Sequence, residues 1–307
     1  MDTLLPLDAQ KDIEQMYSRK TVSKYLRNWV EATHAGLITK GAELVAEWMD
    51  GSYYESKMAR IDQLRDMDIP ELVTQILVNS AYYQREELFV SVTAQMAGIL
   101  GFSDREDGIR TLAELLAVVC HTDAYDIDKD RQNRMWLRSN FVLPAELMEA
   151  ATRTFYLPPM VCPPRTVTSN FDSGYLTEKS SMILGRGNHH DGELCLDVIN
   201  IQNQIPLTLD FEFLQTVDEV PKFAWDEEAD PNLDQQFNWN QFRKESVKVY
   251  ALLSKFPEFF MTHRIDARGR MYAQGYHVSP QGASYKKAMI ELANKEVVDG
   301  VPEQFRK

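Results

Sequence analysis

Apolar residues recur at helical spacing through most of the first 120 residues of the chain. Segment 21–51 carries such positions on either side of a break at Gly36 and predicts helices there. Segment 68–102 has the same period and predicts two more helices, with Asp68 capping the first and Gly101 ending the second. The apolar positions before and after Gly36 are Tyr25, Leu26, Trp29, Val30, Leu37, Leu44, Val45 and Trp48.

The pattern changes after these helices. Two short β-rich runs within 124–143 lie on either side of the polar residues 129–134, which predicts a β-hairpin. Residues 144–156 return to helical spacing, with Pro144 in the first turn. We therefore expect residues 1–156 to form one helical domain that includes the hairpin.

The middle of the chain is divided by proline. Residues 157–192 are rich in proline and glycine and predict an extended, irregular connecting segment at the surface. From residue 193 the helical period returns, and it is interrupted at Pro206, where a helix must kink or restart. A second helical run covers 240–256. Together, residues 193–256 predict an antiparallel pair of long helices around a polar loop.

Length and composition indicate an ordinary globular protein. The chain of 307 residues is long enough to bury at least one sizeable core, and 44% of its residues are hydrophobic and 26% charged. No apolar run approaches the roughly 20 residues that a membrane span needs. Residues 1–15 lack the basic region and cleavage site of a signal peptide. We expect a cytoplasmic protein, mainly α with small β elements and without a membrane span.

Cysteine spacing and net charge exclude some classes of site and of protein. Cys120, Cys162 and Cys195 are far apart and odd in number, so we expect buried, reduced thiols rather than a disulfide framework or a zinc site. The formal net charge of −13 argues against a protein that coats nucleic acid indiscriminately. A local basic groove remains compatible with it, because phosphate contacts depend on where the lysines and arginines lie.

One short segment near the carboxyl end is locally positive. Residues 264–287 hold five cations and a single carboxylate, Asp266. Arg268 and Arg270 alternate on an extended stretch, and Gly269 between them allows the backbone to approach a ligand closely. Arginine forks suit bidentate contacts with phosphate. On its own, Asp-x-x-Gly-Arg is a weak signal that also describes a β-turn with exposed arginines.

The residues that follow extend the same segment. Tyr272 can stack on a base or hydrogen-bond to a sugar. Gln281 and Gly282 belong to a Ser-Pro-Gln-Gly turn, and Lys286 and Lys287 lie in the first turns of a predicted helix, YKKAMIELANKE.

The run from DARGRMYA through SPQG to this helix resembles the DxxGR segment of the single-subunit RNA polymerases of phages and mitochondria. The spacing from the aspartate to Pro-Gln-Gly is one residue longer than in the phage type. Two further segments resemble that family in the right order. Residues 157–176 resemble its PPMxxPPxPWT…GGGY segment, and residues 198–217 resemble the start of its thumb, with Asn200 and Pro206 in corresponding places.

The sequence departs from the family at three of these positions. Val167 and Leu207 replace tryptophans, and Asp210 replaces an asparagine. The resemblance implies a helical-hairpin thumb over 193–256 and the first strands of a right-hand polymerase palm over 257–307.

The resemblance also implies what the positive segment does. In the family, it holds the DNA template strand and the nascent RNA–DNA hybrid beside the active centre. We expect Asp266 to fix the turn and orient an arginine rather than to bind a metal. The expected template and hybrid contacts are Arg268, Gly269, Arg270, Tyr272, Gln281, Gly282, Lys286 and Lys287.

The catalytic carboxylates of the family are missing. Nucleotidyl transfer on two Mg²⁺ ions needs carboxylates that bridge or flank the metals, which the family supplies from Asp-Gly and His-Asp-Ser motifs downstream of DxxGR. This sequence has no His-Asp-Ser, and Asp299-Gly300 follows Asp266 too closely. We therefore assign no catalytic or metal-binding residue to this chain. A second, catalytic subunit is expected to bind Mg²⁺ and the nucleoside triphosphates.

A polymerase divided in this way resembles the heterodimeric RNA polymerase of podophages related to the coliphage with a virion-packaged polymerase. The resemblance implies a subunit of a DNA-directed RNA polymerase, inactive alone, in the cytoplasm of an infected bacterial host. A piece of an undivided polymerase is the alternative, and the polar tail 299–307 favours a natural subunit. The rival from another class is a non-enzymatic helical phage regulatory adaptor that binds DNA or a host protein.

The hairpin over 124–143 corresponds to the one that, in the family, wedges an apolar tip into DNA at the upstream edge of the bubble. Here Lys129, Arg131 and Arg134 surround a polar tip, and Trp136 lies on the returning strand. Because no apolar residue at the tip can replace base stacking, we expect a single-stranded or pre-melted template. An accessory single-stranded DNA-binding factor would supply opened DNA in the cell.

Three further patterns have simpler interpretations. His189, His190 and Asp191 can be considered for a metal site, but adjacent histidines in a Gly-rich loop are more often solvated. Segment 123–130 resembles a calcium loop but lacks the glycine and terminal glutamate of an EF-hand. The acidic run 218–230 is interpreted as a solvated thumb tip, with DNA mimicry as a minor alternative.

Overall fold

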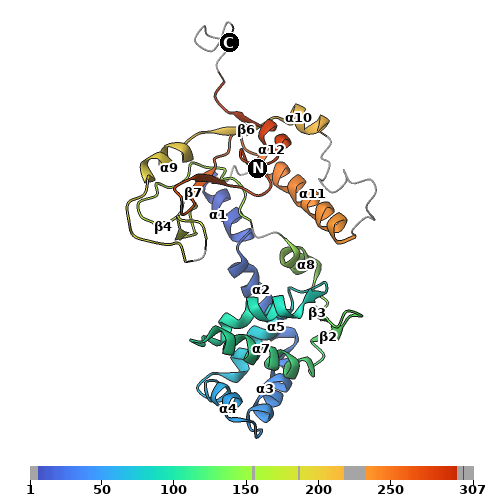
Figure 1. The fold of residues 1–307 in the computed structure, drawn as a ribbon. Coiled ribbons are helices and arrows are strands. Elements are labelled where there is room, and N and C mark those ends of the chain that lie inside the picture. Colours follow the sequence, from blue (N-terminus) through green and yellow to red (C-terminus); the bar gives the residue numbers. More distant parts are fainter. Residues whose placement is uncertain (1–5, 154–155, 186, 218–232, 296–299, 301–307) are drawn as a thin grey trace. The chain divides into compact units, whose positions relative to one another are not determined.

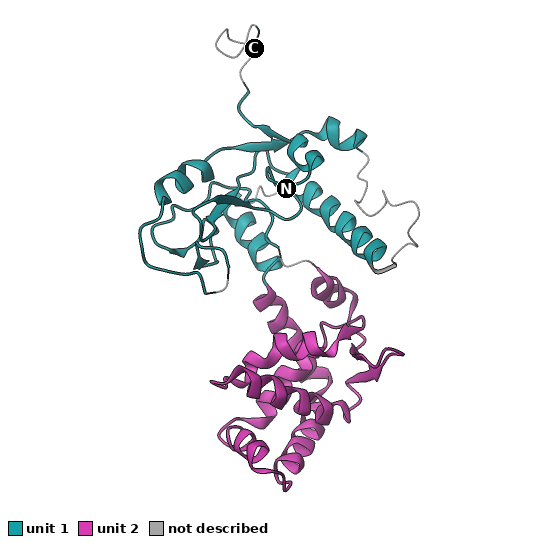
Figure 2. Ribbon diagram, viewed as in Figure 1, with its two compact units in different colours: residues 1–18, 154–307 teal, residues 19–153 magenta. Residues whose placement is uncertain are grey.

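A computed structural model describes residues 6–153, 156–185, 187–217, 233–295 and 300. The structure is mainly helical, with 50% helix and 13% strand in small sheets, which confirms a mainly α fold with small β elements. The chain divides into two compact units, shown in Figure 2. Unit 1 comprises residues 1–18 together with 154–307, and unit 2 comprises residues 19–153.

Unit 2 is built from helices around an apolar core, and α5 (Ile69–Ser80) packs against both α2 (Arg19–Thr33) and α3 (Ala35–Met49). Asp68 caps α5, because its carboxylate accepts a hydrogen bond from the Glu71 backbone N–H at 3.0 Å. Gly101 ends a 3₁₀ turn with a φ of +64°, a conformation that glycine adopts without strain. The helices are α2 (Arg19–Thr33), α3 (Ala35–Met49), α4 (Glu55–Asp62), α5 (Ile69–Ser80), α6 (Phe89–Met96), the 3₁₀ helix η1 (Ala97–Leu100), α7 (Arg105–Cys120) and α8 (Ala145–Thr152).

The predicted hairpin is present in unit 2. Its two strands pair antiparallel from Tyr125 opposite Ser139 to Lys129 opposite Met135. The base of the hairpin is anchored in the core, because the fully buried Tyr125 donates a hydrogen bond from its hydroxyl to the Leu116 carbonyl at 2.7 Å. The strands are β1 (Glu87–Leu88), β2 (Tyr125–Lys129) and β3 (Met135–Ser139), in the spatial order β1-β3-β2.

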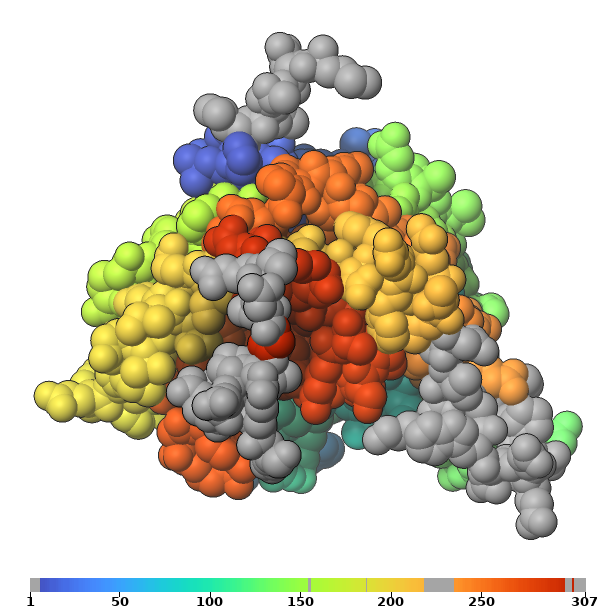
Figure 3. All heavy atoms as spheres, turned by 90° about the horizontal axis from the view of Figure 1, so that it is seen from above, coloured from blue at the N-terminus to red at the C-terminus, as the bar shows by residue number. Residues whose placement is uncertain are grey.

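Unit 1 combines helices with small two-stranded antiparallel sheets. One buried apolar cluster joins Ile13 of α1, Leu209 of β6 and Val249 of α11. In the space-filling view of Figure 3, the red segment of α12 (Ser284–Ala288) and β9 (Ile290–Leu292) lies between yellow α9 and gold α10, in keeping with the pairing of β6 and β9. The elements, of which all but β5, β8 and β9 are labelled in Figure 1, are α1 (Pro6–Met16), β4 (Phe171–Asp172), β5 (Ser180–Ser181), α9 (Leu196–Asn203), β6 (Leu207–Leu209), α10 (Phe211–Thr216), α11 (Leu233–Leu253), β7 (Thr262–Ile265), β8 (Met271–Gln274), α12 (Ser284–Ala288) and β9 (Ile290–Leu292).

The expectation of a long helix before the acidic loop is wrong. The chain instead forms α9, the strand β6 and α10 in succession. Pro206 has no backbone N–H to continue a helix, and the next three residues pair with β9, Leu207 opposite Leu292. Asp210 then caps α10 by accepting a hydrogen bond from the Phe213 N–H at 2.8 Å. The second long helix is present as α11, and the acidic run 218–230 lies outside the described residues.

The helix expected after the Ser-Pro-Gln-Gly turn is also shorter than the pattern predicts. It ends at Ala288, and Ile290–Leu292 form β9. The strand is favoured because its backbone groups pair with β6, an interaction that is invisible to local periodicity. Of the tail 299–307, only Gly300 lies within the described residues.

The first helix belongs to unit 1, which corrects the expectation that residues 1–156 form one domain. Two buried polar side chains of α1 explain this. The Gln10 Oε1 accepts a hydrogen bond from the Val161 N–H at 2.9 Å, and the Glu14 carboxylate accepts from the N–H groups of Leu176 at 2.8 Å and Thr177 at 2.6 Å. Such contacts compensate the cost of burying a carboxylate.

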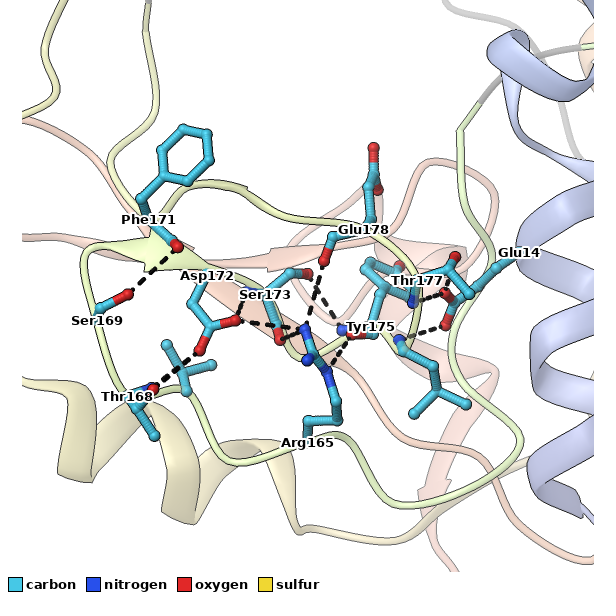
Figure 4. Close-up of polar contacts among 12 residues, drawn as sticks. Glu14, Arg165, Thr168, Ser169, Phe171, Asp172, Ser173, Tyr175, Thr177 and Glu178 are labelled. Atoms are coloured by element: carbon cyan, nitrogen blue, oxygen red, sulfur yellow. Dashed lines mark hydrogen bonds and ion pairs between the residues drawn. The ribbon is translucent and has the colours of Figure 1, made fainter.

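The segment 157–192 is irregular, as predicted, but it is not a surface segment, since Met160, Val167 and Met182 are buried. Side chains replace a regular ladder of backbone hydrogen bonds, as Figure 4 shows. The Arg165 guanidinium donates to the carbonyls of Tyr175 at 2.7 Å and Ser173 at 3.2 Å. Proline and glycine therefore indicate the backbone irregularity here but not the degree of burial.

The three cysteines are free thiols with different exposure. Cys162 is buried, and burial raises its pKa to about 11. Cys120 is half-buried, whereas Cys195 is exposed, so the expectation of buried thiols is wrong for Cys195, which precedes the first turn of α9. Among the helices that the structure describes, none is sufficiently long and apolar to cross a membrane.

Candidate nucleic-acid interface

The Asp-x-x-Gly-Arg pattern forms the tip of the β7–β8 hairpin. The Asp266 N–H donates to the Arg270 carbonyl at 2.9 Å, and the Gly269 N–H donates to the Asp266 carbonyl at 2.9 Å. Gly269 has a φ of +79°, the left-handed conformation that follows a type I turn in a three-residue hairpin loop. The turn itself therefore favours glycine at this position, whatever the segment binds.

The Asp266 carboxylate organises this tip. It accepts backbone hydrogen bonds from Arg268 at 2.9 Å and Arg270 at 3.0 Å. Both guanidinium groups also donate to it, with Nη2 of Arg268 at 3.0 Å and Nε of Arg270 at 2.9 Å. Behind the tip, the Tyr272 hydroxyl lies 3.4 Å from the same carboxylate. Asp266 therefore fixes the turn and orients two arginines at once.

The arginines remain accessible despite these bonds. The side chains of Arg268 and Arg270 are 70% and 53% exposed, whereas that of Asp266 is 15% exposed. Burial alone would raise the pKa of Asp266, but the hydrogen bonds from the backbone and guanidinium of Arg270 outweigh it and lower the pKa. The tip thus keeps an ionised carboxylate inside and presents two guanidinium edges to solvent.

Gln281 connects the Ser-Pro-Gln-Gly turn to the hairpin. Its Oε1 accepts from the Ala273 N–H at 2.8 Å, and its Nε2 donates to the Met271 carbonyl at 3.0 Å. One side-chain amide thus pairs with the β8 backbone as a neighbouring strand would. Gly282 lies under Lys286, whose Cδ would be 2.7 Å from an added Cβ.

The lysines and Arg264 differ in what they present. Lys287 is exposed on α12. Lys286 donates from Nζ to the Tyr276 carbonyl at 2.6 Å. Arg264 is half-buried and donates to the Ser181 carbonyl; burial lowers its pKa against the opposing effect of Glu178. Arg264 therefore holds β7 to β5, and the exposed charge of the segment comes from Arg268, Arg270 and Lys287.

Asn200 and Pro206, predicted to belong to a thumb, have structural partners. The Asn200 side chain accepts from the Val167 N–H at 2.8 Å and donates to the Val167 carbonyl at 2.9 Å. This pair fastens α9 to the irregular segment. The Pro206 carbonyl accepts from the Ala293 N–H at 3.0 Å, next to β9.

The β2–β3 hairpin in unit 2 ends in a turn of the same construction. The Asp130 carboxylate accepts from the N–H groups of Gln132 at 2.8 Å and Arg134 at 2.9 Å, from Nε of Arg134 at 2.7 Å and from the Trp136 indole at 3.0 Å. Asn133, with a φ of +62°, takes the place of Gly269. Lys129, Arg131 and Arg134 are exposed at this tip.

This recurrence escaped the sequence analysis. DRQNRMW at 130–136 and DARGRMY at 266–272 share an aspartate, an arginine, a methionine and a final aromatic residue in one register. Aligning the two hairpins would have revealed it. Turn chemistry favours the aspartate and the left-handed residue in both hairpins, so their recurrence needs no shared function.

The histidine pair forms local contacts. His189 Nδ1 lies 3.0 Å from the Ser181 hydroxyl, and its Nε2 lies 3.5 Å from the Asp191 carboxylate. His190 Nδ1 accepts from the Gly192 N–H at 3.1 Å. Within the described ranges, no three or more His, Cys, Asp or Glu side chains are grouped so that they could hold a metal ion.

Comparison with known proteins does not identify a family, because no family model and no curated protein matches the chain. Two hairpin tips present oriented, exposed arginines. Beside the tip at 266–272, Gln281 is hydrogen-bonded to the β8 backbone and Lys287 is exposed.

Proposed function

We propose that the chain is a subunit of a phage DNA-directed RNA polymerase, which holds the DNA template and the RNA–DNA hybrid. A second, catalytic subunit completes the active site and binds Mg²⁺ and the nucleoside triphosphates. The observation that carries the proposal is the tip of the β7–β8 hairpin, where Asp266 orients the exposed guanidinium groups of Arg268 and Arg270.

Preorganisation makes this tip suitable for phosphate. An arginine that is already held in place loses less conformational freedom when it binds, and its fork makes two parallel hydrogen bonds to phosphate oxygens. The carboxylate between Arg268 and Arg270 keeps the two groups apart and in register. Successive phosphates of one strand are the ligand class that fits two such groups on a short turn.

In this proposal, residues 193–256 serve as the thumb and residues 257–307 as the first strands of the palm. An exposed apolar edge supports a contact with another chain. Leu292 in β9 is 57% exposed, and in the described part of the chain β9 pairs only with β6. A strand with one open edge can accept a strand from a partner.

The proposal is tested by reconstitution. The purified chain alone should incorporate no nucleotides on any template, and activity should appear when the partner subunit is added. A neighbouring reading frame should encode that partner, with the Asp-Gly, fingers-helix and His-Asp-Ser motifs in this order. Robust synthesis by the chain alone would contradict the proposal.

The form of the template is part of the proposal. The polar tip of the β2–β3 hairpin has Lys129, Arg131 and Arg134 exposed and no apolar wedge. The heterodimer should therefore transcribe single-stranded or bubble templates and initiate poorly on linear duplex DNA, with an accessory single-stranded DNA-binding factor supplying opened DNA in the cell. Equal run-off from matched duplex and bubble templates would contradict this part.

A non-enzymatic helical adaptor that binds DNA or a host protein is the second candidate. The recurrence of the Asp266 turn at Asp130 favours it, because the turn then needs no polymerase to explain it. An adaptor would work without a catalytic partner, and Arg268 and Arg270 would have no role in template binding. The reconstitution distinguishes the two candidates.

A further inference from the structure

Five aromatic rings gather on unit 1 beside the Ser-Pro-Gln-Gly turn. We call them the ring cluster: Tyr156, Trp239, Phe242, Tyr276 and His277. Trp239 and Phe242 lie one helical turn apart on α11 and stack with centroids 5.5 Å apart. Phe242 stacks on His277 at 5.2 Å and meets Tyr276 edge to face at 5.4 Å. The cluster thus joins α11 to the loop that precedes α12.

The outer rings of the cluster are open to solvent. Tyr156 and Tyr276 stack with centroids 4.3 Å apart and an interplanar angle of 20°, yet they are 55% and 42% exposed. The inner ring, His277, is only 3% exposed and is held by the Ser246 hydroxyl, 2.9 Å from its Nδ1. His277 meets Tyr276 edge to face at 5.0 Å, so a buried ring lies behind the stacked pair of exposed tyrosines.

Cations accompany these rings. Lys286 Nζ lies 4.6 Å from the centroid of Phe242 and 5.5 Å from that of Tyr276. Arg243 and Lys244 are exposed on α11 immediately after Phe242.

The ten residues of α11 between Asp234 and Glu245 have an unusual composition for so acidic a chain. Residues 235–244 read QQFNWNQFRK, with five amides, three aromatic residues, two cations and no carboxylate, although the whole chain has a net charge of −13. Amides hydrogen-bond to base edges, aromatic rings stack on base faces, and cations neutralise phosphates. The three kinds of side chain together match the chemistry of unpaired nucleotides.

We propose that the ring cluster and the adjoining face of α11 bind single-stranded nucleic acid, with bases stacking on Tyr276 and Tyr156. A duplex does not fit, because its base faces are already stacked. Phosphates complement the charges of Lys286, Arg243 and Lys244, and the exposed stacked rings beside them match base faces, which an acidic protein surface does not offer. The contact uses side chains other than those of the Asp266 turn and requires no catalytic subunit. It extends the expected template contacts, of which Lys286 is one, to Tyr156, Tyr276 and α11.

The test is fluorescence anisotropy of the full chain with labelled oligo(dT) and with a duplex of the same length. Single strands should bind more tightly, and Tyr276→Ala should weaken that binding by about tenfold or more, the usual loss for one stacked base. Tyr276→Trp should retain the affinity because it keeps a stacking face. Tyr156→Ala should weaken it similarly.

The matched control is Tyr25→Ala, which removes a tyrosine of similar exposure, 54%, from α2 in unit 2. It should leave oligo(dT) binding unchanged. Circular dichroism of every variant checks the fold. Because Tyr156 and Tyr276 are exposed, their replacement by alanine should leave the fold intact, so a loss of affinity reports lost binding.

A second measurement uses charge instead of aromatic rings. Arg243→Gln and Lys244→Gln should each reduce the slope of log affinity against log salt by about 0.7, the single-strand value for one phosphate contact. Unchanged slopes together with unchanged affinity of Tyr276→Ala would overturn the inference. Equal affinity of the wild-type chain for duplex and single strands would also overturn it. So would a Tyr276→Ala variant that loses partner-subunit association but keeps oligo(dT) binding, because the cluster would then be a protein interface. Catalysis is not measured, so this outcome is independent of whether the proposed polymerase function holds.

Discussion

The hairpins β2–β3 and β7–β8 belong to different units of the chain, but the same hydrogen-bond pattern closes the turn of each. In each, an aspartate accepts the backbone N–H groups of the second and fourth residues after it, at 2.8 and 2.9 Å for Asp130 and at 2.9 and 3.0 Å for Asp266. In each, a residue with positive φ precedes an arginine, and that arginine lies over the ring two residues later, 5.2 Å from Trp136 and 5.8 Å from Tyr272.

The difference between them lies in what is added to the turn. Where the first hairpin has Gln132, the second has Arg268, whose guanidinium is also bound by the aspartate. The second hairpin has Gln281 paired with its outer strand, whereas β3 pairs with the short strand β1. The shared turn is therefore a folding device, and Arg268, Gln281 and the nearby lysines are the residues that call for a functional explanation.

Removing the central carboxylate should have the largest effect and tests this distinction directly. Asp266→Ala releases both arginines and opens the turn, so template-directed synthesis by the reconstituted heterodimer should fall on the order of 100-fold, as for other misplaced binding groups. Asp130→Ala removes the same carboxylate from the other hairpin and should leave synthesis on single-stranded templates nearly unchanged.

Thermal unfolding of both variants provides the control for global stability. Asp266→Asn should give an intermediate loss, because an amide oxygen can still accept a backbone N–H but cannot balance two guanidinium charges. Equal losses of template-directed synthesis from the changes at Asp266 and Asp130 would mean that both hairpins contribute equally to synthesis.

The arginines should have the next largest effect. Arg268→Gln makes the second tip resemble the first, and it should weaken binding of a single-stranded template by about tenfold, the usual loss for one charge-assisted hydrogen bond to phosphate. Arg270→Ala should cost a similar factor. Arg134→Ala is the matched change in the other hairpin and should have a smaller effect on the same template.

Template affinity is measured by titration of the heterodimer, and size-exclusion chromatography checks that assembly is intact. If Arg268→Gln and wild type bind the template equally well, the exposed guanidinium of Arg268 makes no contact with the template.

A smaller, purely structural effect concerns the left-handed residue of each turn. Gly269→Ala places a Cβ at a φ of +79° and should lower the free energy of unfolding by about 1–2 kcal/mol. Gly269→Asn should be nearly neutral, because asparagine occupies the same place in the first hairpin with a φ of +62° at Asn133. Urea unfolding measures both. A larger loss from Gly269→Asn than from Gly269→Ala would contradict the equivalence of the turns.

The local features of both hairpins were predictable from sequence, whereas their surroundings were not. Helical spacing, the Asp68 cap and the two β-rich runs depend on residues close together in the chain. The β6–β9 pairing and the attachment of α1 through Glu14 join distant segments, and no short pattern encodes them.

The candidate site was predictable to the same extent. Arg268 and Arg270 were recognised because they are neighbours in sequence. The ring cluster was not, since Tyr156, Phe242 and Tyr276 come from three separate segments. The sequence also overstates the number of exposed cations in this segment. Arg264 carries the same charge as its neighbours, but its half-buried guanidinium bonds to the β5 backbone.

The smallest effect is an acid response that the two turns should share. Above all the Trp136 indole N–H, and then Arg134, hold the pKa of Asp130 well below its ordinary range. The pKa of Asp266 is also lowered, because hydrogen bonds from Arg270 outweigh the raising effect of burial. A carboxylate whose pKa is lower in the folded chain stabilises it above the unfolded value of about 3.9, and this contribution is lost as the pH falls through the folded pKa.

Both turns should therefore be unchanged between about pH 5 and 8 and should loosen only below about pH 4. Carboxyl carbon shifts measured by NMR during an acid titration follow the two groups separately. Trp136→Phe removes the indole donor and should raise the titration midpoint of Asp130 without moving that of Asp266. If both aspartates titrate at the ordinary value in the wild-type chain, then the hydrogen bonds around them do not persist in solution, and the rigid tip on which the phosphate contacts depend is lost with them.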